Sequence, residues 1–180
     1  MEIEKHIQAI IKEIDPSDEE AEKTSKRVAK SYEEFFHGYR EEASKVADDA
    51  FYKSEMNDLI ILKNIPFESH CEHHISPIVG FASIGYIPND GRIIGASKLA
   101  RIVDCFARRL QLQERMTIEI VRALESLLKP KGVGAYVEGE HFCISHRGVK
   151  KQGAKFVTRY FSGELKGDLR REFLASVLGK

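Results

Sequence analysis

Residues 69–74, Ser-His-Cys-Glu-His-His, bring a thiol, a carboxylate and three imidazoles together in one short segment. The two-residue gap between Cys71 and His74 lets one turn direct both side chains at a single metal ion. A second cluster, His-Phe-Cys, follows at 141–143, and Cys143 can complete a Cys-His-Cys set. Three protein ligands leave the fourth position of a tetrahedral zinc open, as catalytic zinc requires. The two clusters together predict a catalytic zinc site.

Two further histidines and one cation are placed by the same spacing. Neighbouring side chains diverge in helices and strands alike, so His73 does not share the direction of His74 and is free for proton transfer. If residues 141–143 form a strand, His141 and Cys143 lie on one face, which puts His141 beside the metal. Arg147 keeps the same parity. The predicted site thus has one metal ion, two unligated imidazoles and a cation.

Simpler explanations compete with this interpretation. The pair Cys71 and His74 alone could be chance, and the second cluster makes chance the minor explanation. Cys105 competes for the place of third ligand, but it sits in a helical pattern and is more simply a small helix residue. The remaining histidines are interpreted as solvated or hydrogen-bonded residues: His6, His37, His70 and His146.

Composition limits the class of protein. The chain has 180 residues, 42% hydrophobic, and 28 basic residues balance 28 acidic ones. This balance gives no indication of nucleic-acid or membrane binding, so any phosphate site must be a local cluster. Three cysteines without a signal peptide predict a reducing compartment, and no apolar run approaches the ~20 residues that span a bilayer. We therefore expect a cytoplasmic protein.

The first fifty residues show helical patterns without chemistry. Isoleucines at helical spacing predict a helix over residues 3–14 that Pro16 ends. Ser17 or Asp18 can cap a second helix that runs to Gly38. We expect residues 1–50 to be a helical segment for packing or subunit contact, and residues 51–180 to form the catalytic domain, within one compact domain overall.

The rest of the chain alternates strands and helices. The patterns predict, in order, strands at 59–62 and 78–87, helices at 97–110 and 114–129, a strand pair beginning at 133–137 and carrying 141–143, a strand at 156–161, and a helix at 170–178. This order predicts an α+β fold in which an antiparallel sheet is backed by helices.

A basic helix face could bind phosphate. Ser97 can cap the helix, and Lys98, Arg101, Cys105 and Arg108 follow at spacings of three or four. Free N–H groups and the helix dipole near a helix N-terminus favour an anion there. An ordinary solvated face would be the better explanation if this helix stood alone.

Four motifs in this order resemble the signatures of the GTP cyclohydrolase I family, and the resemblance runs from about residue 26 to residue 174. They are Pro66-Phe67-x-Ser69-x-Cys71-Glu72-His73-His74 followed by Pro77, Gly80 and Tyr86-x-Pro88; Gly95-x-Ser97-Lys98-x-x-Arg101; Gln111-x-Gln113-Glu114-Arg115; and His141-x-Cys143-x-x-x-Arg147-Gly148-Val149.

The resemblance implies a tunnelling fold (T-fold), in which sheets from several subunits join into barrels stacked as a homodecamer, with sites at subunit interfaces. It implies conversion of GTP and water to formate and 7,8-dihydroneopterin triphosphate, the entry step of folate or related pterin synthesis. The family roles fall on these residues: Cys71, His74 and Cys143 for Zn²⁺; His73 and His141 for acid-base catalysis; Ser97, Lys98, Arg101 and Arg147 for the triphosphate or nearby substrate atoms; Gln113 and Glu114 for guanine.

Departures from the family pattern and rival functions remain. Residues 158–163 differ from the family's small, hydroxyl-rich version, which bears on ring assembly or regulation. One rival is another tunnelling-fold enzyme, such as the related nitrile reductase, which uses a Cys nucleophile and a nicotinamide cofactor. The other rival is a structural zinc module or a catalytically silent oligomer partner. Neither requires Lys98, Arg101 and both free histidines beside a complete ligand set.

Overall fold

The computed structural model describes residues 2–179, and these fall into two compact units, Met1–His37 and Gly38–Lys180. The first unit contains two helices, α1 (Glu2–Ile14) and α2 (Ala21–Phe35), which contact each other. Both helices were predicted. Glu20, not Ser17 or Asp18, is the N-cap of α2, although the Asp18 carboxylate accepts a hydrogen bond from the Glu20 backbone N–H at 2.8 Å.

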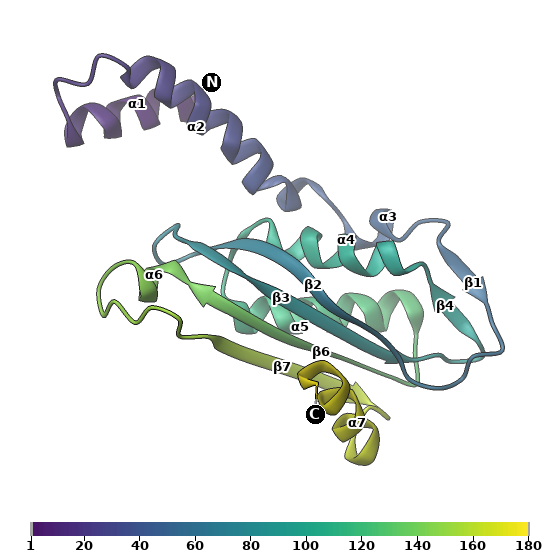
Figure 1. Cartoon of the computed structure of the whole chain (residues 1–180). Coiled ribbons are helices and arrows are strands. Elements are labelled where there is room, and N and C mark those ends of the chain that lie inside the picture. The colour runs from purple at the N-terminus through teal and green to yellow at the C-terminus, as the bar shows by residue number, and fades with distance from the viewer. Residues whose placement is uncertain (1, 180) are drawn as a thin grey trace. The chain divides into compact units, whose positions relative to one another are not determined.

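The second unit holds the sheet and the helices that cover it (Figure 1). A 3-10 turn, η1 (His37–Arg40), crosses the boundary between the units. The elements that follow are α3 (Ala43–Val46), β1 (Phe51–Lys53), β2 (Ile60–Cys71), β3 (Pro77–Ile87), β4 (Arg92–Ile94), α4 (Ala96–Ala107), β5 (Leu110–Gln111), α5 (Gln113–Leu128), β6 (Gly132–His141), α6 (Phe142–Ser145), β7 (Phe156–Gly163) and α7 (Gly167–Leu178).

The main sheet has the strand order β5-β2-β3-β6-β7. Strands β2, β3, β6 and β7 pair antiparallel, and the two-residue β5 joins the edge of β2 in parallel. Alternation decides which side of β3 is covered: Ile78 and Ala82 are buried, whereas Val79 and Phe81 between them are exposed. The α+β prediction of an antiparallel sheet backed by helices is confirmed.

Helices α4 and α5 lie along one face of the sheet and enclose the main core (Figure 1). Leu99 and Ile102 of α4 and Ile120 and Leu124 of α5 are fully buried there. Such helical spacing of apolar residues gives each helix one buried stripe. A smaller cluster forms beyond Gly85, whose missing Cβ leaves room for the ring of Phe173 from α7. Helix α4 contacts β2 and helix α5 contacts β6, and these two strands lead to the predicted site.

Strand β2 is longer than the predicted strand at 59–62 and runs to Cys71 itself. It contains Pro66, which has no N–H for a ladder. On its outer edge, β2 is paired with β5 only at His70 and Cys71. Pro66 lies outside this pairing, where a missing N–H costs no hydrogen bond to β5. His70, predicted to be solvated or hydrogen-bonded, is buried at the end of this strand.

Other sequence predictions failed at element ends. β6 stops at His141, and Cys143 lies on the single-turn helix α6, so the two residues do not share a strand face as predicted. Gly95, not Ser97, is the N-cap of α4, and no side chain caps that helix. Cys105 is buried and does not belong to the exposed basic face of α4.

Within residues 2–179, no helix is both long and apolar enough to cross a membrane. Residues 38–50 belong to the second compact unit, in contact with the elements of the sheet domain. A functional boundary at residue 50 stays a prediction, because compactness alone does not measure which segment folds or acts by itself.

Gly80 tests the closeness of β3 and β6. A Cβ at Gly80 would lie 2.0 Å from the backbone oxygen of Glu138, which can move only with its strand. We expect Gly80→Ala to lower the free energy of unfolding by about 3 kcal/mol. Thermal or urea unfolding measures the loss. Gly95→Ala is the matched control, because its Cβ would meet nothing nearer than 3.9 Å; equal stability of the two variants would contradict the packing argument.

Candidate metal centre and active site

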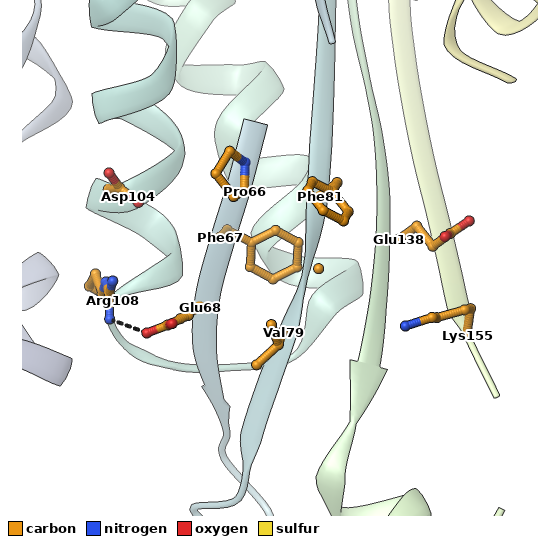
Figure 2. A pocket seen from close by; sticks show the side chains of 10 residues that line it. Pro66, Phe67, Glu68, Val79, Phe81, Asp104, Arg108, Glu138 and Lys155 are labelled. Carbon is orange, nitrogen blue, oxygen red and sulfur yellow. Dashed lines mark hydrogen bonds and ion pairs between the residues drawn. The ribbon is translucent and has the colours of Figure 1, made fainter. Parts of the chain in front are cut away.

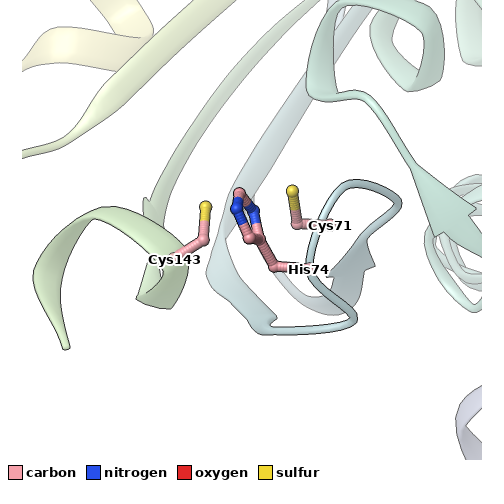
Figure 3. A group of neighbouring side chains, drawn as sticks. All are labelled: Cys71, His74 and Cys143. Carbon is pink, nitrogen blue, oxygen red and sulfur yellow. The ribbon is translucent and has the colours of Figure 1, made fainter. Parts of the chain in front are cut away.

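Three predicted ligand atoms converge although two segments far apart in sequence carry them. The ligating atoms of Cys71, His74 and Cys143 all lie within 4.8 Å of one another. Figure 3 shows the two sulfur atoms on either side of the His74 ring, with Cys143 on α6 and the others at the turn after β2. Cys71 is buried, Cys143 half-buried and His74 exposed. The group is thus rooted in the core and open on one side.

The turn between β2 and β3 holds Cys71 and His74 together. The Cys71 N–H donates to the Ser76 carbonyl at 2.8 Å, and the Cys71 carbonyl accepts from Ile75 at 2.8 Å and from His74 at 3.3 Å. Ile75 has φ 53, the left-handed region that a β-branched residue rarely adopts. Such a conformation costs roughly 1–3 kcal/mol and persists only where its surroundings impose it. The hydrogen bonds around Cys71 impose it here.

The β3–β6 ladder brings Cys143 to this turn. Ile78, near the start of β3, pairs with His141, the last residue of β6. The chain then bends into α6, and this one helical turn directs Cys143 back toward Cys71. Cys143 therefore reaches the metal group by a helical turn, not by the strand parity that the sequence suggested.

The donor set fits a zinc ion. Zinc binds thiolate sulfur at about 2.3 Å and imidazole nitrogen at about 2.0 Å, so ligand atoms around one ion lie roughly 3.5 Å apart. Separations of up to 4.8 Å need only small side-chain movements to reach this geometry. Arg147 donates to Nε2 of His74 at 3.0 Å. A neutral imidazole has one lone pair, so this bond and coordination by the same nitrogen exclude each other.

Arg115 fastens the turn from outside, a contact that the sequence analysis missed. Its guanidinium donates to the Glu72 carboxylate, to Gln111 Oε1 at 3.0 Å and to the Leu110 carbonyl at 3.1 Å. The Glu72 N–H in turn donates to the Gln111 carbonyl at 3.1 Å. Gln111 lies on β5, before α5 begins, so helical spacing did not indicate its contact with Arg115. The partner Glu72 could not be found from spacing.

A cavity of about 300 Å³ adjoins the metal group. It is lined by Cys71, His73, His74, Gln111, Leu112, Gln113, Glu114, His141, Cys143, Ile144 and Phe156. The structure thus gathers both predicted acid-base histidines and both predicted guanine residues around the three ligands. The rings of His73 and His74 are nearly perpendicular, at 87°, with centroids 6.2 Å apart. His73 accordingly diverges from its neighbour, as a residue outside the ligand set should.

His141 is the more enclosed of the two histidines. Burial lowers the pKa of His141 below its usual value, and the negative charge of Glu114 opposes that shift in part. The ring of Phe156 meets the His141 ring edge to face, with centroids 5.3 Å apart. His141 Nε2 lies 3.0 Å from Gln113 Oε1. Sequence reasoning found neither Phe156 nor this bond, because each depends on how β7 and α5 pack.

Four predicted triphosphate residues do not line this cavity among the described residues: Ser97, Lys98, Arg101 and Arg147. Ser97, Lys98 and Arg101 lie in the first half of α4. The other end of α4 is the one near the metal turn, since Arg108 is paired with Glu68 of β2 at 3.0 Å. At 1.5 Å per residue, Ser97 and Arg108 are roughly 16 Å apart along the helix. The chain therefore does not bring the N-terminus of its α4 to its own candidate metal group.

A larger hollow, of about 450 Å³, lies elsewhere on the sheet (Figure 2). Residues of β2, β3 and α4 line it, among them exposed Phe81 and the ion pair of Arg108 with Glu68. It includes no cysteine or histidine. Nucleophiles, proton carriers and metal ligands gather instead at the smaller cavity, which we take as the candidate active site.

Comparisons with known proteins agree over nearly the whole chain. The sequence model described as GTP cyclohydrolase I matches residues 3–178. The chain is 48% identical over 156 residues to GTP cyclohydrolase 1 of Pelagibacter ubique, covering 86% of this chain and 77% of that protein. It is 47% identical over 152 residues to GTP cyclohydrolase 1 of Brucella anthropi, covering 84% of this chain and 71% of that protein.

A solved structure shares the fold. The apo crystal structure of the archaeosine synthase QueF-Like matches with a TM-score of 0.50 and 21% identity, over 63% of this chain and 100% of that one. A likeness at this identity concerns the fold alone. Together with the antiparallel sheet backed by helices, this likeness confirms the predicted tunnelling fold.

Metal affinity should depend on pH. Burial, together with the neighbouring Cys71 thiol, raises the pKa of Cys143, so this thiol keeps its proton to higher pH and a metal ion must displace it. We expect zinc affinity to rise about tenfold per pH unit between pH 6 and 8 for each proton released. Competition with a chelator at fixed pH measures this. An affinity independent of pH would contradict thiol ligation.

Arg115 should support metal binding without touching the ion. Because it anchors Glu72, the neighbour of Cys71, we expect Arg115→Met to weaken zinc binding roughly tenfold, at the lower end of the 10–100-fold effects of outer ligand partners. Arg122→Met on the exposed side of the same helix is the matched control. Equal zinc affinities in the two variants would remove the anchoring role.

Proposed function

Because the chain belongs to the GTP cyclohydrolase I family, we propose that it is a zinc-dependent hydrolase that converts GTP and water to formate and 7,8-dihydroneopterin triphosphate, the entry step of folate or related pterin synthesis. The observation that carries the proposal is the Cys71, His74 and Cys143 group on a cavity that also holds two further histidines and a carboxylate. The family match alone would not require these groups to converge.

The ligand set suits hydrolysis at C8 of the purine. Zinc held by Cys71, His74 and Cys143 would lower the pKa of a bound water toward about 7, which makes hydroxide available at neutral pH. Cys71, Cys105 and Cys143 are free thiols in the structure and form no disulfide with one another. A reducing cytoplasm would keep Cys71 and Cys143 available as ligands, and we propose that location.

The two free histidines divide the proton transfers. His141 lies beside the ligand group and is the candidate for exchanging a proton with N7 of the purine as C8 is hydrated. His73, on the exposed turn, is the candidate for protonating the ribose oxygen and for moving protons as the ring opens and rearranges. Imidazoles titrate nearest to neutral pH of all side chains, so both can serve in either direction.

Glu114 is our candidate for guanine recognition. It is exposed at the first turn of α5 and lines the cavity. Guanine offers adjacent N–H groups at N1 and N2, and one carboxylate can accept from both. Adenine presents an acceptor at N1 instead. Once a bound base covers Glu114, an acceptor left without its partner there would cost roughly 1–3 kcal/mol, so Glu114 would discriminate GTP from ATP.

The triphosphate would be bound across a subunit interface. The distance of Ser97, Lys98 and Arg101 from the metal group of their own subunit supports a site completed by another copy. We propose a homo-oligomer, a decamer by family resemblance, in which these three residues approach a neighbour's cavity. Arg147, next to His74, would contribute charge from the same subunit as the metal.

Formate release is the decisive measurement. Zinc-loaded protein incubated with GTP should release formate and yield a product that becomes fluorescent on oxidation to neopterin. Inosine triphosphate, which lacks the N2 amino group, tests the base recognition. Absence of turnover in a zinc-loaded, correctly assembled protein would favour a catalytically silent partner over the enzyme.

Two substitutions separate metal binding from catalysis in the same assay. We expect Cys143→Ala to lose both stoichiometric zinc and activity, because one of three ligands is gone. His141→Ala should keep zinc and lower formate release by about 10²–10⁴-fold, the usual range for a general acid-base group. Equal loss of metal in both variants would show that His141 is a ligand.

A further inference from the structure

Gln113 is polar, fully buried and in contact with a proposed catalytic residue. It is the first residue of α5, where its side chain turns inward while its neighbour Glu114 stays exposed. A buried amide is costly unless all of its polar atoms are bonded. The bonding of this amide shows what it is for.

The amide nitrogen of Gln113 faces three acceptors. It donates to the Phe156 carbonyl at 2.9 Å, the Thr158 hydroxyl at 3.1 Å and the Val137 carbonyl at 3.2 Å. Two of these are backbone carbonyls, which can only accept. An amide turned the other way would set its oxygen against them. The nitrogen therefore faces β6 and β7, and Oε1 faces the His141 ring.

Two threonines complete the same network. The hydroxyl of Thr117 donates its hydrogen to the backbone carbonyl of Gln113 at 2.7 Å. It must therefore accept from the hydroxyl of Thr158, 2.7 Å away. The lone pairs of Thr158 are then left for the Gln113 amide. The two amide hydrogens of Gln113 serve three acceptors, so one hydrogen is shared; all three acceptors lie on the nitrogen side, which fixes the orientation of the amide.

We propose that Gln113 is a positioning residue that makes Nδ1 of His141 the atom exchanging protons with the substrate. Because Gln113 Oε1 can only accept, the His141 nitrogen bonded to it, Nε2, must carry a hydrogen. The bond fixes the plane of the ring, and Nδ1, for which residues 2–179 supply no hydrogen-bond partner, is the nitrogen left to face the substrate.

This inference rests on the proposed function and changes one part of it. The amide of Gln113 is already bonded to β6, β7 and His141, so its side chain is assigned to His141 and base recognition is assigned to Glu114. The two adjacent residues differ by about 100° in direction on the helix, enough for one to point inward and the other to the cavity rim. Their kinetic signatures should differ accordingly.

The kinetic test compares Gln113→Met with wild type. Met keeps the length of the side chain but accepts no strong hydrogen bond. We expect kcat for formate release to fall at least about thirtyfold, less than the 10²–10⁴-fold loss for removal of the acid-base group itself, while KM for GTP changes less than about threefold. The ratio of activities on GTP and inosine triphosphate should stay as in wild type. A raised KM with unchanged kcat, or lost base discrimination, would overturn the proposal in favour of guanine binding.

A second variant reaches the same oxygen without changing Gln113. A Cβ at Gly139 would lie 2.9 Å from Gln113 Oε1, so Gly139→Ala should displace it and reproduce the loss of kcat. Gly134→Ala is the matched control on the same strand, since its Cβ would press on the ring of Phe161 at 2.3 Å and not on Gln113; its kcat should stay within about twofold of wild type. A Gly134→Ala loss as large as that of Gly139→Ala would overturn the proposal, because general destabilisation of β6 would then explain both.

A spectroscopic readout does not depend on turnover. In zinc-loaded protein labelled with ¹⁵N-histidine, solid-state NMR distinguishes ring nitrogens that carry a hydrogen from those that do not, and His141→Asn identifies the signals. We expect a hydrogen on Nε2 of His141 in wild type and a mixture of tautomers in Gln113→Met. A hydrogen on Nδ1 alone, or identical spectra in the two proteins, would overturn the inference. If wild type releases no formate, the proposed function fails while these spectra still decide the role of Gln113.

Discussion

The antiparallel ladder between β3 and β6 is the constraint on which the candidate site depends. Pairing of Ile78 with His141 sets the end of β6 beside the turn that follows β2. Residues separated by about seventy positions in sequence thereby meet around one small volume. The two strands lie so close together at Gly80 that a single methyl group there would collide with the backbone of β6. This register sets the positions of the candidate metal ligands, the candidate acid-base histidines and the residues that line the cavity.

The start of α5 shows how one helix serves both the core and the chemistry. Gln113 is buried and bonds to two strands, whereas Glu114 is exposed and lines the cavity. Arg115, one residue further on, secures the turn that bears Cys71. Three consecutive side chains thus point in three directions and act on three parts of one site. Because helical neighbours diverge by about 100°, a single helical turn can do this without any distortion of the backbone.

Sequence reasoning found the three side chains that converge, Cys71, His74 and Cys143, because metal coordination imposes both residue type and spacing. It also found the main helices and strands, whose apolar periodicity records one buried face. It failed for Cys143, which it placed on a strand, because a four-residue helix is too short to leave a periodic pattern. The bonds of Arg115 and Gln113 were invisible for a different reason: both join segments whose contact depends on tertiary packing. Hydrogen bonds between segments far apart in sequence cannot be predicted from residue spacing in a single sequence.

The position of Cys143 on α6 has a consequence for biosynthesis. The ribosome must add 72 residues after Cys71 before Cys143 exists, and β7, whose backbone and Thr158 anchor the amide beside His141, comes later still. Nascent chains fold progressively from their N-terminus. A metal ion that needs all three side chains can therefore be bound only after Cys143 has emerged from the ribosome.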